Sequence, residues 1–196
     1  MTQPDNLQAN PQITRCPWCK ISNPLYVAYH DHEWGKYCRN DRRIYELFLL
    51  EGFQAGLSWE TILNKRENFR RAYDDFDIDK VCLYDDEKIE ELMGNPGIIR
   101  HRGKIAASIE NSRIIREIRR EFGSFSGYLD TFTEGKVIFE PDISVTRSEL
   151  SDTISSDMKR RGMKFAGTTI IYAFLQACGR INSHVKECFL YKEVEE

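Results

Sequence analysis

Apolar residues recur at helical spacing along most of this sequence, and the two-residue alternation of a half-buried strand is nearly absent. The longest helical stretch runs from about Gly103 to Phe122, where isoleucines recur near helical spacing and Gly123 marks the end. A chain whose segments can bury only helical faces has to pack helix against helix. The sequence therefore predicts an all-α fold.

Six further segments show the start signals, apolar faces or stop signals of helices. Ser58 stands where an N-cap is expected, and the run from Gly94 to Gly97 breaks a short helix with a Pro and two Gly. We expect these helices over residues 41–52, 58–69, 85–93, 126–132, 152–161 and 168–178.

The N-terminal part of the sequence lacks these patterns. Residues 1–14 are polar, so we expect a disordered tail there and no secretory signal. Residues 15–36 are rich in aromatics and interrupted by Pro and Gly, which favours irregular backbone. No apolar run approaches the roughly 18 residues that cross a bilayer. We expect a cytoplasmic protein without membrane contact, with residues 15–192 forming a single domain of two helical lobes.

Charge is distributed unevenly along the chain, which carries 28 Lys and Arg against 31 Asp and Glu, a net charge of −3. Residues 98–120 hold seven Lys and Arg and two Glu, whereas residues 74–91 hold nine Asp and Glu and two Lys. A nucleic acid responds to the local field rather than to the total charge. The slightly acidic total therefore excludes no class of partner, although charged runs are also common on solvated helix faces.

Cysteines and histidines near the two ends of the sequence have the residue types of a metal site. His184 and Cys188 stand four residues apart, which would place both side chains on one face of a helix. A closed structural zinc site takes four nitrogen or sulfur ligands. Cys16 offers a third ligand, and the spacing leaves both Cys19 and His30 open as the fourth. The alternative is an ordinary histidine beside two unrelated thiols.

Residues 92–104 join the short helix to the long one and carry glycines and cations. Glycine lets backbone N–H groups approach a phosphate closely, and the start of the following helix adds partial positive charge. Arginine and lysine would add charge-assisted contacts. Such a segment can also be only a turn. The candidate phosphate-contacting residues in this hairpin are Gly97, Arg100, Arg102, Gly103 and Lys104.

Glu51 is the only charged residue between Glu46 and Glu60, and it lies in an apolar, aromatic neighbourhood. A buried carboxylate needs a partner, and perturbed carboxylates cluster at functional sites. Aromatic residues that can build a stacking pocket around it are Trp18, Tyr26, Tyr29 and Trp34. Taken one at a time, each of these aromatics is more simply a core residue, so the functional interpretation requires that they form a set.

The sequence at these positions resembles the DNA-3-methyladenine glycosylase I family. The resemblance runs from residue 15 to about residue 188 through several long stretches. These stretches are residues 15–18 (RCPW), 24–31 (PLYVAYHD), 33–35 (EWG), 50–59 (LEGFQAGLSW), 97–105 (GIIRHRGKI), 159–165 (KRRGMKF), 167–169 (GTT), 176–179 (QACG) and 182–184 (NSH).

The resemblance implies a helix-hairpin-helix fold in which a structural zinc ion joins the two ends of the chain. The implied zinc ligands are Cys16, His30, His184 and Cys188, and the implied catalytic residue is Glu51, with Trp18, Tyr26, Tyr29 and Trp59 around the base. The implied substrate is double-stranded alkylated DNA, from which 3-methyladenine is flipped and released as the free base. We expect a monomer, with residues 98–120 and 159–164 facing the DNA and residues 74–91 turned away from it.

Two other functions remain open from the sequence. A glycosylase with lyase activity would use an amine such as that of Lys104 to form a Schiff base with the sugar. A non-catalytic, zinc-stapled DNA-binding module would keep the hairpin without using the pocket. Related hairpin glycosylases commonly use an Asp after the hairpin, but no Asp occurs between Asp86 and Asp130. This absence agrees with what the resemblance implies for the 3-methyladenine family.

Overall fold

The computed structural model describes residues 13–191, which fold almost entirely into helices. The predicted tail lies outside the described residues up to residue 12, as does residue 192 at the predicted end of the domain. The elements in chain order are α1 (Pro24–His32), α2 (Asp41–Gln54), α3 (Trp59–Ala72), η1 (Asp74–Phe76), α4 (Ile78–Val81), α5 (Asp86–Gly94), α6 (Arg102–Phe122), α7 (Phe125–Thr133), β1 (Ile138–Phe139), α8 (Glu149–Arg160), α9 (Thr168–Ala177) and β2 (Ile181–Asn182).

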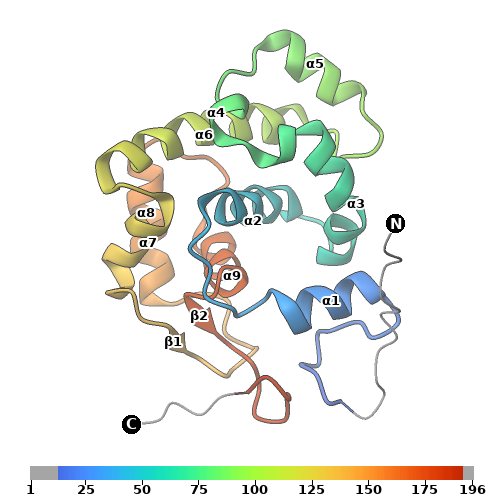
Figure 1. Cartoon of the computed structure of the whole chain (residues 1–196), viewed down its shortest axis with the longest axis vertical. Coiled ribbons are helices and arrows are strands. Elements are labelled where there is room, and N and C mark those ends of the chain that lie inside the picture. The colour runs from blue at the N-terminus through green and yellow to red at the C-terminus, as the bar shows by residue number, and fades with distance from the viewer. Residues whose placement is uncertain (1–12, 192–196) are drawn as a thin grey trace, which may run out of the picture.

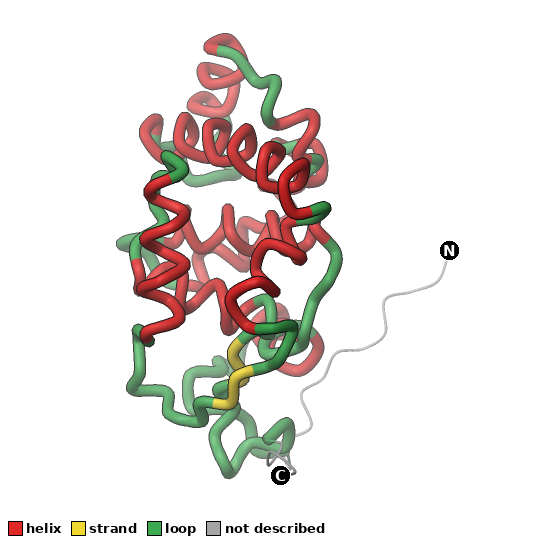
Figure 2. The backbone as a smooth tube through the Cα atoms, turned by 90° about the vertical axis from the view of Figure 1, so that its left-hand side faces the viewer, coloured by secondary structure: helices red, strands yellow, loops and turns green. Residues whose placement is uncertain are grey.

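Helix α2 lies at the centre of the fold and contacts α3, α6, α7 and α9 (Figure 1). Nine of its fourteen residues are buried, which follows from its nearly continuous apolar sequence. Figures 1 and 2 place α5 at one end of the long axis and the two short strands toward the other. The helices thus pack around α2, and its residues are within reach of most other elements.

Local sequence signals set most helix boundaries where they were predicted. The Ser58 hydroxyl accepts a hydrogen bond from the backbone N–H of Thr61 and begins α3, and Asp85 caps α5 in the same way through Lys88. Gly123 ends α6 with a positive φ of 80°. Helix α2 begins at Asp41 as expected but continues past Gly52 to Gln54. The prediction of a mainly helical fold is therefore confirmed.

Two predictions of local structure were wrong. Residues 15–36 are not irregular throughout, because α1 runs from Pro24 to His32. Proline fits the first position of a helix, where its missing N–H is not needed, and the Asn23 side chain caps the start. The expected helix around His184 and Cys188 does not form, since residues 183–191 are turns and irregular backbone.

A two-residue parallel pair, β1 with β2, was not expected from the sequence because no alternation is visible in so short a segment. Just before β2, Gly179 has a φ of 75°, and a Cβ there would lie 2.2 Å from the carbonyl carbon of Lys36. This close approach lets the Cys38 N–H donate to the carbonyl of Cys178. The segment after α1 is thereby held against the end of α9.

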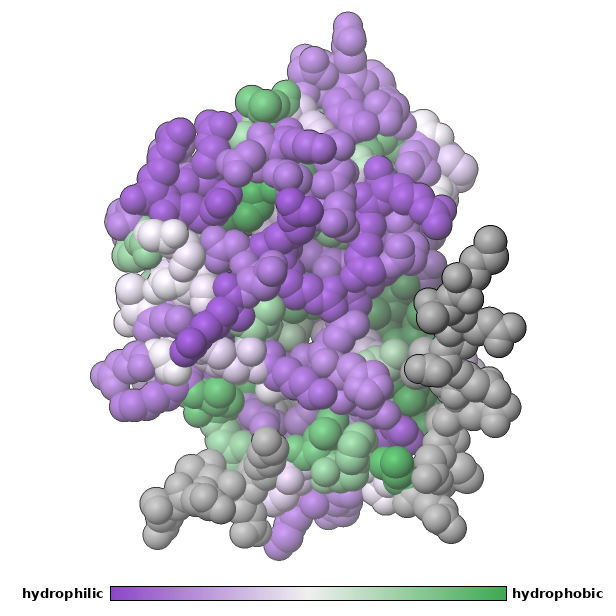
Figure 3. Space-filling model, in the orientation of Figure 1, coloured by the Kyte–Doolittle hydropathy of each residue, from purple (hydrophilic) through white to green (hydrophobic). Residues whose placement is uncertain are grey.

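The surface differs between the two ends of the molecule. Figure 3 shows mostly hydrophilic residues over the end that contains α3, α5 and α6, and more hydrophobic residues toward the opposite end. Among the described residues, no helix is both long enough and apolar enough to cross a membrane.

Candidate active site and metal centre

A pocket of about 260 Å³ opens between α1, α2 and α3 on one side and α9 with the loop before α8 on the other. This volume is near the lower end of the range for small-molecule sites, about 300 Å³ and upward. The residues that the sequence singled out for a pocket all line it, namely Trp18, Tyr26, Tyr29, Trp34, Glu51 and Trp59.

The aromatic residues form one connected cluster in the wall of this pocket. Trp18 lies 5.8 Å from Tyr26, 6.5 Å from Tyr29 and 4.7 Å from Trp34 between ring centroids. Tyr29 in turn lies 5.2 Å from Trp59, which begins α3. Rings at these separations and angles pack by their edges and faces and hold each other in place. The condition that the aromatics form a set is met by the structure.

Glu51 is buried in this wall without a neutralising partner. Its side chain makes no hydrogen bond and no ion pair with any of residues 13–191, and burial raises the pKa of its carboxyl to about 8. The neighbouring phenols stay neutral as well, since burial raises the pKa of Tyr26 to about 12 and that of Tyr29 well above its ordinary value. Glu51 is therefore the group in this wall that can become charged near neutral pH.

Trp59 brings a second unpartnered polar group to the pocket. Its indole Nε1 is buried and has no acceptor within the described part of the chain. Because an indole N–H is a donor that normally finds a partner when buried, it is available to a ligand that brings an acceptor.

One turn before Glu51 on the same helix, Glu46 lies in a very different environment. Its Oε1 accepts hydrogen bonds from Arg66 at 2.8 Å and from Arg70 at 2.9 Å, and Arg43 pairs with its other oxygen. Burial alone would raise the pKa of Glu46, but the arginines outweigh burial and lower it. Arg66 also pairs with Glu33, which follows α1, so the network ties α1 to α2 and α3 behind the pocket.

The sequence did not single out several pocket residues that come from the C-terminal half of the chain. Tyr172 and Gln176 on α9 line the pocket, as do Ile143 and Val145 from the loop before α8. The Tyr172 hydroxyl donates to Glu140 at 2.7 Å and anchors the start of that loop. No local pattern marks these residues, although Gln176 lies in one of the stretches that carry the family resemblance.

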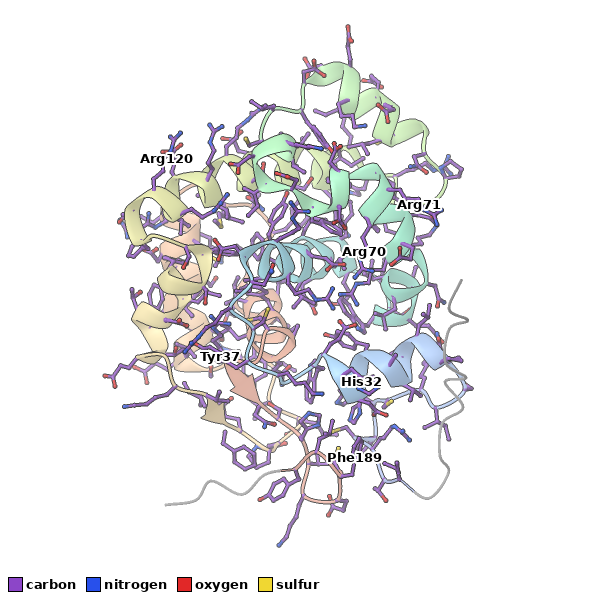
Figure 4. The ribbon with its side chains drawn as sticks, viewed as in Figure 1. His32, Tyr37, Arg70, Arg71, Arg120 and Phe189 are labelled. Carbon is purple, nitrogen blue, oxygen red and sulfur yellow. The ribbon has the colours of Figure 1, made fainter. Side chains whose placement is uncertain are left out.

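The predicted metal ligands meet at one point although they come from opposite ends of the chain. Cys16, His30, His184 and Cys188 are buried, and their ligand atoms all lie within 4.8 Å of one another. The Phe189 N–H donates to the carbonyl of Thr14, which adds a backbone link between the two ends. Figure 4 shows Phe189 beside the N-terminal segment, below α1.

The donor set and its spacing fit a tetrahedral metal. The Cys16 Sγ lies 3.4 Å from the His184 Nδ1, and the Cys188 Sγ lies 3.5 Å from both the His184 Nδ1 and the His30 Nε2. Sulfur and nitrogen ligands of one tetrahedral zinc ion are about 3.6 Å apart, given bond lengths of about 2.3 and 2.0–2.1 Å. These four residues therefore form a buried cluster that can hold a metal ion.

Protonation and outer contacts support this assignment. Burial lowers the pKa of His184 to about 4 and also lowers that of His30, so both imidazoles are neutral at pH 7 and present a lone pair. Burial also raises the pKa of the Cys16 thiol to about 12, so a thiolate there requires a cation beside it. The His30 Nδ1 lies 2.8 Å from the Asp31 carboxylate, an arrangement common for metal-bound histidine.

The other cysteines take no part in the cluster. Cys19, which the spacing left open as a ligand, is buried, and its Sγ lies 4.0 Å from the carbonyl of Tyr26. His30 occupies the fourth position instead. Cys178 is buried in the apolar core, and the Sγ of the buried Cys82 accepts from the Arg116 guanidinium at 3.1 Å.

The hairpin between α5 and α6 folds through its own hydrogen bonds. The Gly97 N–H donates to the Asn95 side chain at 2.8 Å, and a Cβ at Gly97 would lie 3.0 Å from Asn68 on α3. Gly97 thus packs closely against α3, and its N–H is not free for a phosphate. Arg100 and Arg102 are exposed, and Arg102 pairs with Glu90.

Lys104 does not point toward the surface where a phosphate would lie, contrary to the sequence-based prediction. It is 8% exposed, and its Nζ donates to the backbone carbonyls of Phe53 at 2.9 Å and Ala55 at 2.6 Å. It is also absent from the pocket that contains Glu51. The carbonyls at the end of α2 lack intrahelical partners and attract a cation, which explains the inward orientation.

The acidic segment lies beside the basic helix rather than apart from it. Helices α4 and α5 both pack on α6, and Arg119 pairs with Asp79 at 3.2 Å. Arg113 donates to the carbonyls of Cys82 and Tyr84. Figure 4 shows Arg120 extending outward from α6, away from α3. Much of the positive charge in residues 98–120 is therefore paired with groups of the protein itself. These residues do not form the free basic face that the sequence indicated.

Comparison with known proteins gives consistent matches. The family described as methyladenine glycosylase matches residues 18–191. DNA-3-methyladenine glycosylase 1 of Escherichia coli (strain K12) is 43% identical over 187 residues, covering 91% of this chain and 97% of that protein. DNA-3-methyladenine glycosylase of Haemophilus influenzae is 39% identical over 179 residues, covering 89% and 96%. A crystal structure of 3-methyladenine DNA glycosylase I matches with a TM-score of 0.87 at 42% identity, covering 91% of this chain and 100% of the other.

Proposed function

The chain belongs to the methyladenine glycosylase family and is a hydrolase of N-glycosyl bonds, and on this basis we propose that its pocket receives 3-methyladenine flipped out of double-stranded DNA. The observation that carries the proposal is a buried carboxyl, Glu51, without a partner in an aromatic wall. Related structures include a complex of 3-methyladenine DNA glycosylase I with 3-methyladenine.

Glu51 distinguishes the damaged base by its charge. Methylation at N3 makes the base in DNA a cation, whereas normal adenine is neutral. With a pKa of about 8, Glu51 must lose a proton to act as an anion at pH 7, which costs about 1.4 kcal/mol. A unit charge about 4 Å away in an effective dielectric of about 20 contributes roughly 4 kcal/mol. The cationic base therefore induces ionisation of Glu51, and neutral adenine does not.

The aromatic residues add to this preference. The faces of Trp18, Tyr26, Tyr29 and Trp59 attract a cationic ring by about 0.5–2 kcal/mol relative to a neutral one. The unpartnered indole N–H of Trp59 can donate to a ring nitrogen of the base. Because the methylated base is already an activated leaving group, selective binding in this pocket favours its release over that of normal bases.

The hairpin provides the contacts to the DNA backbone in this proposal. Arg100 is exposed, and no pairing partner for it is found among residues 13–191, so its guanidinium is available to a phosphate. The first turn of α6 leaves backbone N–H groups at Arg102 and Gly103 without helical acceptors, which suits an anion. Lys104 and Gly97 then shape the hairpin rather than contact the phosphate with their ammonium and N–H groups.

We further propose that the metal held by the Cys2His2 cluster is zinc. Zinc would supply a cross-link between the two ends of the described chain and take no part in base release. Elemental analysis should find about one zinc per chain in the wild type. The variant His184→Ala should lose this zinc. An unchanged zinc content would contradict the ligand assignment. Since one chain supplies the pocket, the hairpin and the cluster, we propose that it acts as a monomer.

The lyase alternative requires a lysine amine at the sugar. The Lys104 ammonium donates to two carbonyls outside the pocket, so it is badly placed for a Schiff base. Borohydride treatment in the presence of abasic DNA should therefore give no covalent adduct. The family membership favours a glycosylase over the alternative of a non-catalytic DNA-binding module.

Release of free base from methylated duplex DNA tests the proposal. The protein should release 3-methyladenine from alkylated duplexes and release no adenine from an unmethylated duplex of the same sequence. Chromatography of the ethanol-soluble products measures both. DNA binding without release of 3-methyladenine would contradict the proposed substrate.

A further inference from the structure

We propose that Lys65 and Lys104 are positioning residues that hold the hairpin at a fixed place relative to the base pocket. Both donate hydrogen bonds from their ammonium groups to backbone carbonyls. The inference rests on the proposed function, in which the hairpin contacts the DNA backbone while the pocket receives the base.

Lys104 connects the start of α6 to the end of α2. Its ammonium bonds the carbonyls of Phe53 and Ala55, and the Gln54 carbonyl between them accepts from the Leu57 N–H at 2.6 Å. All three carbonyls at this helix end are thereby satisfied. Glu51 lies one turn earlier on α2, and Gln54 lines the pocket. Lys104 therefore fixes the start of α6 relative to the helix that carries Glu51.

Lys65 connects the other side of the hairpin to α3. Its Nζ donates to the carbonyls of Pro96 at 3.0 Å and Gly97 at 3.4 Å. Asn68, almost one turn later on α3, packs closely against Gly97, where an added Cβ would lie 3.0 Å from its side chain. Helix α3 begins with Trp59 in the pocket wall. The turn of the hairpin is thus fixed to the helix that carries one of the base-contacting rings.

The two lysines together attach the hairpin to two of the helices that build the pocket wall, α2 and α3. Figure 1 shows the connection from α5 to α6 passing beside α3. When the hairpin holds a phosphate, the distance to Glu51 decides whether a flipped base reaches the carboxyl. An error of about 1 Å in such a placement costs about a hundredfold in rate. Positioning the hairpin is then a requirement for base release but not for DNA binding.

The test compares Lys65→Met and Lys104→Met with the control Lys136→Met. The Lys136 side chain is 74% exposed and, among residues 13–191, pairs only with Glu134, so its variant should match the wild type. Each of the other two should lower the rate of release of 3-methyladenine from methylated duplex DNA by about tenfold to a hundredfold. Binding of free 3-methyladenine, followed by tryptophan fluorescence, should be unchanged because the pocket itself is intact.

The salt dependence of DNA binding separates positioning from phosphate contact. A lysine that contacts a phosphate lowers the slope of log affinity against log salt by about 1 when it is removed. We expect no change of slope for either variant. A lower slope would overturn the proposal in favour of a direct contact, and a parallel loss of affinity for the free base would overturn it in favour of a role in the pocket.

The double variant provides a further check. Because both lysines hold the same segment, the loss of rate in Lys65→Met/Lys104→Met should be smaller than the product of the single losses. Losses that multiply would contradict a shared role. If Lys104→Met does not fold, the predictions for Lys65→Met still test the proposal. Lys65 lies nearer the surface, so its variant should fold. A wild type that releases base and variants that match the control would overturn this inference and leave the proposed function standing.

Discussion

Two carboxyl groups on α2 are almost equally buried but lie in opposite electrostatic environments. Glu46 is 5% exposed and Glu51 is 4% exposed. Three arginines surround Glu46 and keep its pKa low, whereas Glu51 faces a pocket and burial raises its pKa to about 8. Burial thus does not by itself distinguish structural from functional charge. The missing partner makes Glu51 the candidate functional group, because in the proposed function the ligand provides the compensating charge.

Removing the carboxylate of Glu46 should have the largest effect on stability. Glu46→Gln leaves the buried Arg66 with Glu33 as its remaining carboxylate and takes one partner from Arg70. Breaking a buried ion pair in this way costs about 3–5 kcal/mol. Chemical denaturation at pH 7 measures the change in the free energy of unfolding. A loss below about 1 kcal/mol, the range of exposed pairs, would remove the contrast between the two sites.

Removing the carboxylate of Glu51 should instead affect activity. Glu51→Gln loses the attraction for the cationic base, about 4 kcal/mol, less the cost of ionisation, about 1.4 kcal/mol. We expect release of 3-methyladenine from methylated duplex DNA to fall about a hundredfold. The free energy of unfolding at pH 7 should not decrease, since no partner of Glu51 is lost. Retained activity would show that the unpartnered carboxyl is not the recognition group.

The contributions of Glu46 and Glu51 to the free energy of unfolding should change in opposite directions as the pH rises. The pKa of Glu51 is raised on folding, so its contribution is most favourable below the ordinary value of 4.5 and is lost as pH rises toward about 8. The pKa of Glu46 is lowered, so its contribution is present above 4.5 and is lost at lower pH. The free energy of unfolding of Glu51→Gln, relative to that of the wild type, should therefore rise by up to about 1.4 kcal/mol for each pH unit between about 5 and 8.

Denaturation of the wild type and both variants from about pH 8 to below pH 4.5 checks the opposite signs. Because the pKa of Glu46 lies below its ordinary value of 4.5, Glu46→Gln should approach the wild type only at pH values below 4.5, where the native carboxyl is also protonated. Parallel pH profiles for the two variants would show that the two carboxyls do not differ as the structure indicates.

A half-buried carboxyl at the surface of α3, Glu60, supplies the smallest expected effect. Glu60 pairs with Lys20 and Asn23 at the surface, where solvent screens the interaction. Glu60→Gln should leave the melting temperature within the scatter of repeated scans and should not change base release. A substantial loss of stability would mean that an ion pair stabilises the protein even without burial. Pairing alone would then account for the difference between Glu46 and Glu51.

Local sequence signals predicted much of the fold. Caps such as Ser58 and stops such as Gly123 act within one turn of the chain, so their effect is visible without tertiary contacts. Where two signals conflict, the sequence was less informative. Pro24 indicated a break, yet it begins α1 because the first position of a helix tolerates proline.

The candidate site was predicted in its residues but not in its geometry. Glu51 stood out as a single charge in an apolar run, and Cys16, His184 and Cys188 stood out by residue type. The choice of His30 over Cys19 in the cluster depends on the orientation of α1, to which no local pattern refers.

The sequence by itself determined that the chain folds into helices with an isolated acid among aromatic residues, because helical spacing, caps and composition are properties of neighbouring residues. Only the tertiary structure decided that Glu46 is neutralised and Glu51 is not. Their partners, or the lack of them, depend on Arg66 and Arg70 of another helix and on the pocket formed with α9. The same is true of Lys104, a cation by sequence whose orientation is set by the carbonyls of α2. Charge is encoded locally, but its energy depends on what the fold places within a few ångströms.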